Sequence, residues 1–480
     1  MRTKLLGLGF GIGLLAMPPI ILAQEQQMPD MAMRALKAEY PRMGRALQKS
    51  DTKAFTLEDA EQLARQKNPT LRQAEAGIRA AKAQQQQAGL LPNPVVGYSG
   101  DEIRGGSSGG GKHGFFVEQR IVTGGKLRRA KDVAGKDATL AEIEAEEQKT
   151  RVETAVRMAF YRVLAAQELA DARADLAQIA AENLEVQRRL ANTGQADDTE
   201  ILSAEIETHR KKISARMAEN TLREEWRSLA AVLGVADLPL RVVSGDLEQG
   251  WPQLNEEEIV DTIAKGSPAM RIAEASSDRA SAELARAKRE AVPDVRLRAG
   301  LDYNNELLSG IPRPTGWEGS AEAAVELPVF NRNQGNVAAA AAEIDRAQAE
   351  RERINLTLRE RAASVVDEYA NARLMASAYR DEILPRARKA YGLMTDRYGQ
   401  MLASYPRVLE TKQRLYELQV EYISALENVW STGLALQGYL LTDGLESPAR
   451  PSEMDRPVRE TNVPMPERNM GPGGQGVPQP

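Results

Sequence analysis

The chain has 480 residues, a net charge of −5 and no cysteine. So mild a charge does not predict nucleic-acid binding, and no nucleic-acid partner is expected. The lack of cysteine excludes disulfides, thiolate metal sites, a cysteine nucleophile and a lipid anchor of the bacterial lipoprotein kind. Only 6 phenylalanines occur, which suits slender helical packing better than a thick globular core.

The N-terminus predicts an export signal. Basic residues precede an apolar run over 5–22, and residues 1–23 are expected to be a cleaved signal peptide. An uncleaved membrane anchor is the alternative, but Pro18 and Pro19 break the run, which is short for a membrane span. Residues 24–54 are polar and irregular, and we expect a flexible segment there.

This flexible segment carries the one metal hypothesis. Met28, Met31 and Met33 could offer soft thioether ligands to Cu(I) or Ag(I), although an exposed segment can also simply contain methionine. The two histidines, His113 in a glycine-rich loop and His209 on a helix, have no ligand or catalytic partner at a useful spacing. No enzyme activity, catalytic residue or cofactor is therefore expected.

Heptad spacing of apolar residues predicts one long helix from about 127 to 191. After a turn at 192–198, a return helix is expected with Thr199 as its N-cap. This helix is about half as long as the outgoing one. A helix over 57–89, with Thr56 as its N-cap and acids in its first turn, is expected to stack end to end with it, so that the two short helices match the length of the long one. A plain coiled-coil dimer explains the long helix alone, whereas the unequal pieces favour an antiparallel bundle.

The whole plan then repeats. Asn68 and Pro69 in the first helix correspond to Ser267 and Pro268 in a helix from about 255 to 290. A second long helix, interrupted at a proline, and a second return helix follow. The expected organisation is a first repeat over 55–240, a connector over 241–254, a second repeat over 255–441 and a disordered proline-rich tail over 442–480. The long helix of the second repeat is expected over about 336–398, with its interruption near Pro385.

Each repeat also holds two predicted strands of membrane-spanning length, about 95–103 and 114–121 in the first and about 294–303 and 317–327 in the second. Apolar and polar side chains alternate in the second pair, so that each strand has one apolar face. A hairpin on a soluble core is the alternative, but no other pattern is available to cover that face. Four strands cannot close a barrel, and open edges are not tolerated in lipid, so three chains are expected to share about 12 strands.

Between Phe55 and Leu441 the chain resembles the outer-membrane efflux protein family of TolC, most closely its heavy-metal branch. The resemblance rests on these motifs: Leu57-Glu58-Asp59-Ala60, Asn68-Pro69, Ala88-Gly89-Leu90-Leu91-Pro92-Asn93-Pro94, Asp101-Glu102, Gly124-Gly125-Lys126, Leu327-Pro328-Val329-Phe330, Arg397-Tyr398 and Val408-Leu409-Glu410. The sequence departs from the family pattern in two ways. It lacks the cysteine on which many relatives carry a lipid, and it has Arg407 at a position where an acid is common.

The resemblance implies a mainly α-helical fold with four membrane β-strands per chain, in a homotrimer whose 12-strand barrel stands over an α-helical barrel. It implies a Gram-negative outer membrane location that extends into the periplasm, with lipid, a periplasmic adaptor and an inner-membrane RND-type pump as partners. The implied function is passive conduction of heavy-metal cations. Efflux of drugs or organic compounds, or type I secretion, remains the alternative for the same channel, and a periplasmic coiled-coil adaptor is the alternative of a different class.

The resemblance also implies two sites at the inter-helix turns. The adaptor is expected to dock at Gly194, Ala196, Met401 and Ala403. A ring of acids in a three-fold pore favours cations, and the expected gate residues are Asp197, Asp198, Asp396, Arg407 and Glu410. The alternative is that these acids are ordinary solvent-exposed charges at helix ends, with no role in a pore. Arg407 could neutralise Glu410, or pair with Asp396 and latch the gate shut.

Overall fold

The structure, a computed structural model, describes residues 54–103, 110–307 and 314–447. The predicted signal peptide and most of the predicted tail lie outside these residues. The described chain divides into two compact units. We call Gln167–Asn220 with Ala378–Glu421 the hairpin unit, and Ala54–Ala166, Thr221–Ser377 and the described residues after 421 the strand unit.

The same order of elements occurs twice: two short helices, two strands, a long helix and a return helix. The first set is α3 (Leu57–Lys67), α4 (Pro69–Ala88), β1 (Val95–Asp101), β2 (Lys112–Ile121), α5 (Lys126–Asn192) and α6 (Asp198–Leu233). The second set is α7 (Glu256–Gly266), α8 (Pro268–Arg289), β3 (Val295–Leu307), β4 (Pro314–Val325), α9 (Gln334–Ala378), the π-helical turn η1 (Tyr379–Ile383), α10 (Leu384–Gly399) and α11 (Tyr405–Gln437). Among the described residues, no helix has both the length and the apolar character needed to cross a membrane.

Each of the short helices predicted over 57–89 and 255–290 is in fact two helices. Asn68 and Ser267 have extended backbone, with ψ of 124° and 146°, because a residue that precedes proline is driven out of the helical region. Each side chain then caps the helix that follows, by accepting a backbone N–H at 2.8 Å for Asn68 and 3.3 Å for Ser267. The prediction of continuous helices was wrong at these two prolines.

The other helix starts and interruptions follow local chemistry. Thr56 caps α3, as predicted, and forms a capping box with Asp59. The predicted cap at Thr199 was wrong, because α6 begins at Asp198, two residues earlier than that cap implies, and the Asp197 carboxylate accepts the Glu200 N–H at 2.9 Å. The predicted interruption near Pro385 is present as η1, since proline has no N–H to continue the helical hydrogen bonds.

Asn68 also connects the helix break to the end of the second repeat. Its amide nitrogen donates to the carbonyls of Val232, at 2.7 Å, and Gly444, at 3.4 Å. Gln148 on α5 donates to the Thr70 hydroxyl at 2.8 Å. The side chains of Asn68, Thr70 and Gln148 are buried, and this polar network holds the segment after α11 against α4 and α5.

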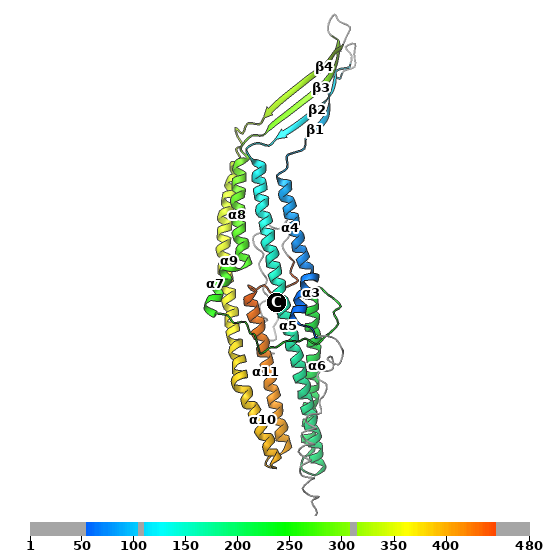
Figure 1. Cartoon of the computed structure of the whole chain (residues 1–480), viewed down its shortest axis with the longest axis vertical. Helices are drawn as coiled ribbons and strands as arrows, with labels where there is room; N and C mark the ends of the chain where they lie inside the picture. Colours follow the sequence, from blue (N-terminus) through cyan, green and yellow to red (C-terminus); the bar gives the residue numbers. More distant parts are fainter. Residues whose placement is uncertain (1–53, 104–109, 308–313, 448–480) are drawn as a thin grey trace, which may run out of the picture. The chain divides into compact units, whose positions relative to one another are not determined.

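The four strands form one antiparallel sheet in the order β1-β2-β3-β4, and they lie side by side where α4, α5, α8 and α9 lead to them (Figure 1). Val295 pairs with Val325, and Tyr303 pairs with Trp317, so the alternation predicted for the second pair is in register. His113 lies on β2 opposite Gly100, and its predicted place in a loop was wrong. Within the described chain, β1 and β4 each have one unpaired edge.

Candidate functional site

The sheet has one apolar face that no described part of the chain covers. The face consists of Val96, Tyr98, Phe115, Val117, Ile121, Val295, Leu297, Ala299, Leu301, Tyr303, Trp317, Ala321, Ala323 and Val325, together with His113 and Gln119. Phe115 and Trp317 are each 69% exposed. The rings of Tyr303 and Trp317 lie 5.4 Å apart, and the Tyr98 hydroxyl bonds the His113 ring, so aromatic groups gather at the end away from the helices. This pattern is typical of a strand surface that faces lipid.

The opposite face of the sheet is charged and internally paired. Lys112 Nζ lies 2.9 Å from Glu318 Oε2, and Arg296 Nε lies 3.3 Å from Glu118 Oε1. Arg298 stands over the Phe116 ring, 3.9 Å from its centroid. Side chains of this kind suit a surface that contacts water, such as the wall of a pore.

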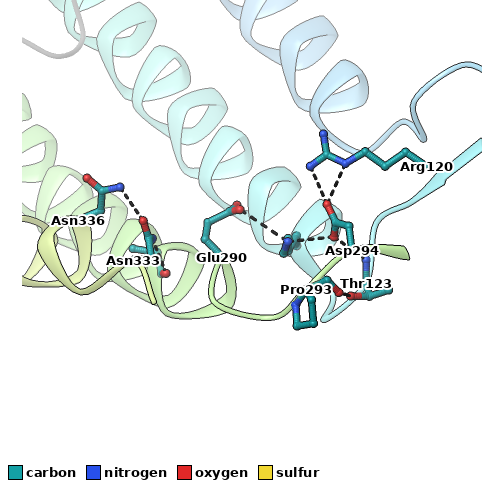
Figure 2. Close-up of polar contacts among 9 residues, drawn as sticks. Arg120, Thr123, Glu290, Pro293, Asp294, Asn333 and Asn336 are labelled. Atoms are coloured by element: carbon teal, nitrogen blue, oxygen red, sulfur yellow. Dashed lines mark hydrogen bonds and ion pairs between the residues drawn. The ribbon is translucent and has the colours of Figure 1, made fainter. Parts of the chain in front are cut away.

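A polar junction centred on Asp294 joins the two repeats where strands meet helices (Figure 2). Its Oδ2 accepts from Arg120 Nε at 2.9 Å and Nη2 at 2.6 Å, and its Oδ1 accepts from Lys126 Nζ at 2.9 Å and the Thr123 N–H at 3.1 Å. The Thr123 hydroxyl donates to the Pro293 carbonyl. One carboxylate thus connects the β2–α5 segment to the start of β3.

The charge of Asp294 is strongly favoured in this junction. Burial raises the pKa of the carboxyl, but hydrogen bonds from Lys126, Arg120 and the Thr123 backbone outweigh it and lower the pKa to about 2. The sequence interpretation missed this residue, because four donors from a segment about 170 positions away leave no local pattern.

The two inter-helix turns have the same backbone geometry. Gln195 N bonds Leu190 O at 2.8 Å, and Leu402 N bonds Arg397 O at 2.8 Å, which is the pattern of a Schellman motif. The residue in the left-handed position is Gly194 in the first turn, with φ of 72°, and Met401 in the second, with φ of 60°. Met401 is 86% exposed. The other two predicted docking residues, Ala196 and Ala403, lie in the same turns and are half-buried.

The predicted gate residues all lie in the hairpin unit, near these turns. Asp197 caps α6, and Asp198 is the exposed first residue of that helix. Asp396, Arg407 and Glu410 are exposed on α10 and α11. In the described part of the chain no ion pair joins Arg407 to Asp396 or to Glu410, so neither pairing considered from the sequence is formed here.

Ion pairs that sequence reasoning missed join the two hairpins of this unit, and two tyrosines pack against each other within the second hairpin. Lys211 Nζ lies 2.8 Å from Glu417 Oε1, and Lys412 Nζ lies 4.0 Å from Glu182 Oε2. The Tyr398 and Tyr405 rings lie 5.4 Å apart. Burial, with the negative charge of Glu182, raises the pKa of Tyr405. The spacing of seven places Tyr391 and Tyr398 on one face of α10, but Tyr405 lies beyond the turn on α11, so no helical spacing signals its contact with Tyr398.

A metal site is not apparent in the described residues. Within residues 54–103, 110–307 and 314–447, no three or more His, Cys, Asp or Glu side chains are grouped so that they could hold a metal ion. Met28, Met31 and Met33 lie outside the described residues.

Comparison with known proteins matches most of the chain. The sequence profile of the outer membrane efflux protein family matches residues 61–235 and 259–440. The cobalt-zinc-cadmium resistance protein CzcC of Cupriavidus metallidurans is 24% identical over 388 residues, which cover 80% of this chain and 90% of that protein. The nickel-cobalt-cadmium resistance protein NccC of Alcaligenes xylosoxydans xylosoxydans is 26% identical over 313 residues, covering 63% of this chain and 67% of that protein.

Solved structures show a similar fold. The crystal structure of CusC aligns with a TM-score of 0.65 at 16% identity, over 80% of this chain and 91% of CusC. The outer membrane protein VceC of Vibrio cholerae aligns with a TM-score of 0.61 at 19% identity, over 81% of this chain and 97% of VceC.

Proposed function

Because this chain belongs to the outer membrane efflux protein family, we propose that it is the outer-membrane channel of a tripartite efflux system. In this role it conducts substrates passively from a periplasmic adaptor and an inner-membrane RND-type pump to the exterior. The observation that carries the proposal is the two-faced sheet, with an uncovered apolar face and a paired, charged opposite face. Such a sheet fits a wall between lipid and an aqueous pore.

The assembly that we propose is a homotrimer. The sheet of one chain has four strands and unpaired edges at β1 and β4, and each unpaired backbone group in lipid costs several kcal/mol. Pairing β4 of one chain with β1 of the next satisfies these groups without any new strand. Three chains give about 12 strands, a number within the range of membrane barrels.

Heavy-metal cations are the substrates that we propose. CzcC and NccC, whose names record resistance to cobalt, zinc, cadmium and nickel, are similar along most of their length. Organic compounds or secreted proteins are the alternative substrates of the same channel.

Two functional sites in the hairpin unit belong to this proposal. The exposed turns at Gly194–Ala196 and Met401–Ala403 would dock the adaptor, and their matching backbone geometry supports equivalent roles in the two repeats. The acids Asp197, Asp198, Asp396 and Glu410, with Arg407, would line the gate, where a three-fold assembly repeats each charge three times.

The test is deletion of the gene, followed by measurement of cellular cobalt, zinc and cadmium under sublethal exposure. Cells without the protein should accumulate metal, and the wild-type gene should restore the lower level. Outer-membrane fractions should contain a heat-resistant trimer. A soluble monomer would contradict the channel itself, whereas a trimer with unchanged metal content and raised retention of organic compounds would contradict only the metal substrate.

A further inference from the structure

The segments that connect the outer strands to their helices expose large apolar side chains. Between β4 and α9, Leu327 is 70%, Val329 59% and Phe330 91% exposed. Leu90 and Leu91, between α4 and β1, are exposed as well. Removal of apolar surface from water is favourable by about 25 cal/mol per Å², so the three exposed side chains that lie together between β4 and α9 indicate an apolar partner.

The apolar face of the sheet is too short to match a membrane by itself. From the Val295–Val325 pair to the Tyr303–Trp317 pair, the face runs about 27 Å at about 3.4 Å per residue. At a strand tilt of about 40° this becomes about 21 Å of height, against an apolar band of about 25 Å in membrane barrels. The segment with Leu327 and Val329 continues the apolar positions beyond Val325, on the side where the helices begin. These side chains can therefore supply the missing height.

Three basic side chains flank the same segment. Lys288 and Arg289 lie in the last turn of α8, and Arg332 lies in the turn before α9. Asn333 Nδ2 donates to the Ala287 carbonyl at 2.8 Å, which holds that turn against the end of α8 (Figure 2). All three basic side chains are exposed, and none forms an ion pair within the described residues.

We propose that residues 327–332 form an interfacial membrane anchor. Leu327, Val329 and Phe330 enter the leaflet next to the helices, and Lys288, Arg289 and Arg332 bind the phosphates of its phospholipids. Apolar side chains beside basic ones are the combination by which segments bind a membrane surface. The anchor rests on the proposed function, since it requires the sheet to span the outer membrane.

A second copy of the chain is the other occupant to consider, because β4 is an edge strand of the sheet. A neighbouring copy would bring its segment Leu90-Leu91-Pro92-Asn93-Pro94 close to this surface. That segment contains no acid, so it offers the three cations no opposite charge. Phospholipid complements both the apolar and the basic side chains, and the charges therefore favour lipid.

Spin labelling tests the apolar half of the anchor. The chain has no cysteine, so Phe330→Cys gives a single label in each chain of the full-length protein. In vesicles of phosphatidylethanolamine and phosphatidylglycerol, the label should be accessible to oxygen and shielded from a water-soluble nickel chelate. Trp317→Cys, on the apolar face, is the lipid-exposed reference, and Lys149→Cys, exposed on α5, is the aqueous reference.

The labels separate the occupants. An immobile label at residue 330, shielded from both reagents, would place a second copy there, and a label accessible to the nickel chelate would place water there. Either result overturns the anchor. If the label at residue 317 is in lipid and the label at 330 is not, the anchor fails while the channel stands. If neither label is in lipid, the proposed function fails too.

Lipid selectivity tests the basic half. Native mass spectrometry of the purified trimer, equilibrated with phosphatidylglycerol and phosphatidylcholine, gives the ratio of the two lipids retained. Lys288→Gln, Arg289→Gln and Arg332→Gln should each lower this ratio about fivefold, since one basic residue at a membrane surface contributes about 1 kcal/mol. Arg72→Gln, Arg79→Gln and Lys149→Gln, exposed on α4 and α5, are the matched control. If the lipid ratio is unchanged and the melting temperature falls, the three basic side chains only stabilise the helix end by interacting with the negative pole of the α8 dipole. That result would overturn the phosphate site.

Discussion

Asp294 illustrates how one residue can join two repeats. It lies at the start of β3, and its donors come from the end of β2 and the beginning of α5. Lys126 is itself buried, and it is also 3.9 Å from Glu290, so its charge depends on these acids for compensation. The junction is therefore sensitive to the charge of a single carboxylate.

We expect Asp294→Asn to lower the free energy of unfolding by about 1–2 kcal/mol at pH 7, after allowance for screening by water. The pKa of Asp294 is about 2 in the folded chain, below the value of about 3.9 in an unfolded chain. Its stabilisation is thus complete above the unfolded value and is lost as the pH falls through about 2. Thermal melting of wild type and variant from pH 7 to pH 2 should show two curves that converge in acid.

The control for this prediction is Asp278→Asn. Asp278 Oδ2 lies 2.8 Å from Lys136 Nζ, but the side chain is 65% exposed, and exposed pairs contribute little. A constant difference between wild type and Asp294→Asn across the whole pH range would show that the loss comes from packing and not from charge.

The left-handed residues of the two turns give a second prediction at the residue scale. A side chain in this conformation costs about 1 kcal/mol relative to glycine. Met401→Gly should therefore raise the melting temperature, whereas Gly194→Ala should lower it. A Cβ at Gly194 would meet no atom within 4 Å, so its cost is conformational and not steric. Met401→Ala, which keeps the strain and shortens the side chain, should melt like wild type, and a rise there would argue against this explanation.

At the scale of elements, the break between α3 and α4 holds the end of the second repeat through Asn68. Asn68→Ala removes a helix cap, worth about 1 kcal/mol, and leaves the carbonyls of Val232 and Gly444 without this donor, so a total loss of about 2–4 kcal/mol is expected. Asn68→Ser keeps a capping oxygen and should lose less. Denaturant melts measure both variants.

Ser267 provides the matched control, because it caps α8 at the equivalent break and is equally buried. Ser267→Ala should cost only the cap, about 1 kcal/mol. Equal losses for Asn68→Ala and Ser267→Ala would mean that the bonds to Val232 and Gly444 contribute nothing measurable.

At the scale of the whole molecule, the exposed turns should decide whether the channel engages its adaptor. Gly194→Glu, Ala196→Glu, Met401→Glu and Ala403→Glu, tested singly, are expected to abolish metal export and to leave a heat-resistant trimer. Exposed Gly392→Glu, within α10 and outside the predicted docking turn, serves as the comparison. Normal export by all four variants would place docking elsewhere.

The charge of the gate gives the last prediction. In planar bilayers, Glu410→Gln combined with Asp198→Asn should reduce the preference for cations several-fold, because acids in a narrow pore raise the local cation concentration. Arg407→Gln should increase that preference, since it removes three positive charges from a trimeric pore. Glu360→Gln, on the middle of α9, is the control. Wild-type selectivity in the first two variants would mean that the constriction lies elsewhere.

The sequence by itself determined the duplicated order of elements, the long helices, and the alternation that gives the sheet two faces. These features are local or periodic, and a spacing of seven or two residues records which side chains share a face. Thr56 was found for the same reason, because a capping box lies within four consecutive residues.

Only the tertiary structure revealed what depends on contacts between distant segments. The Asp294 junction, the carbonyl partners of Asn68 and the ion pair of Lys211 with Glu417 all join residues more than 150 positions apart. The breaks at Asn68 and Ser267 are local, and the rule that a residue before proline avoids helix could have predicted them. Buried polar partners are different: they are selected by where the backbone brings donors and acceptors together, and no spacing along the chain records that choice.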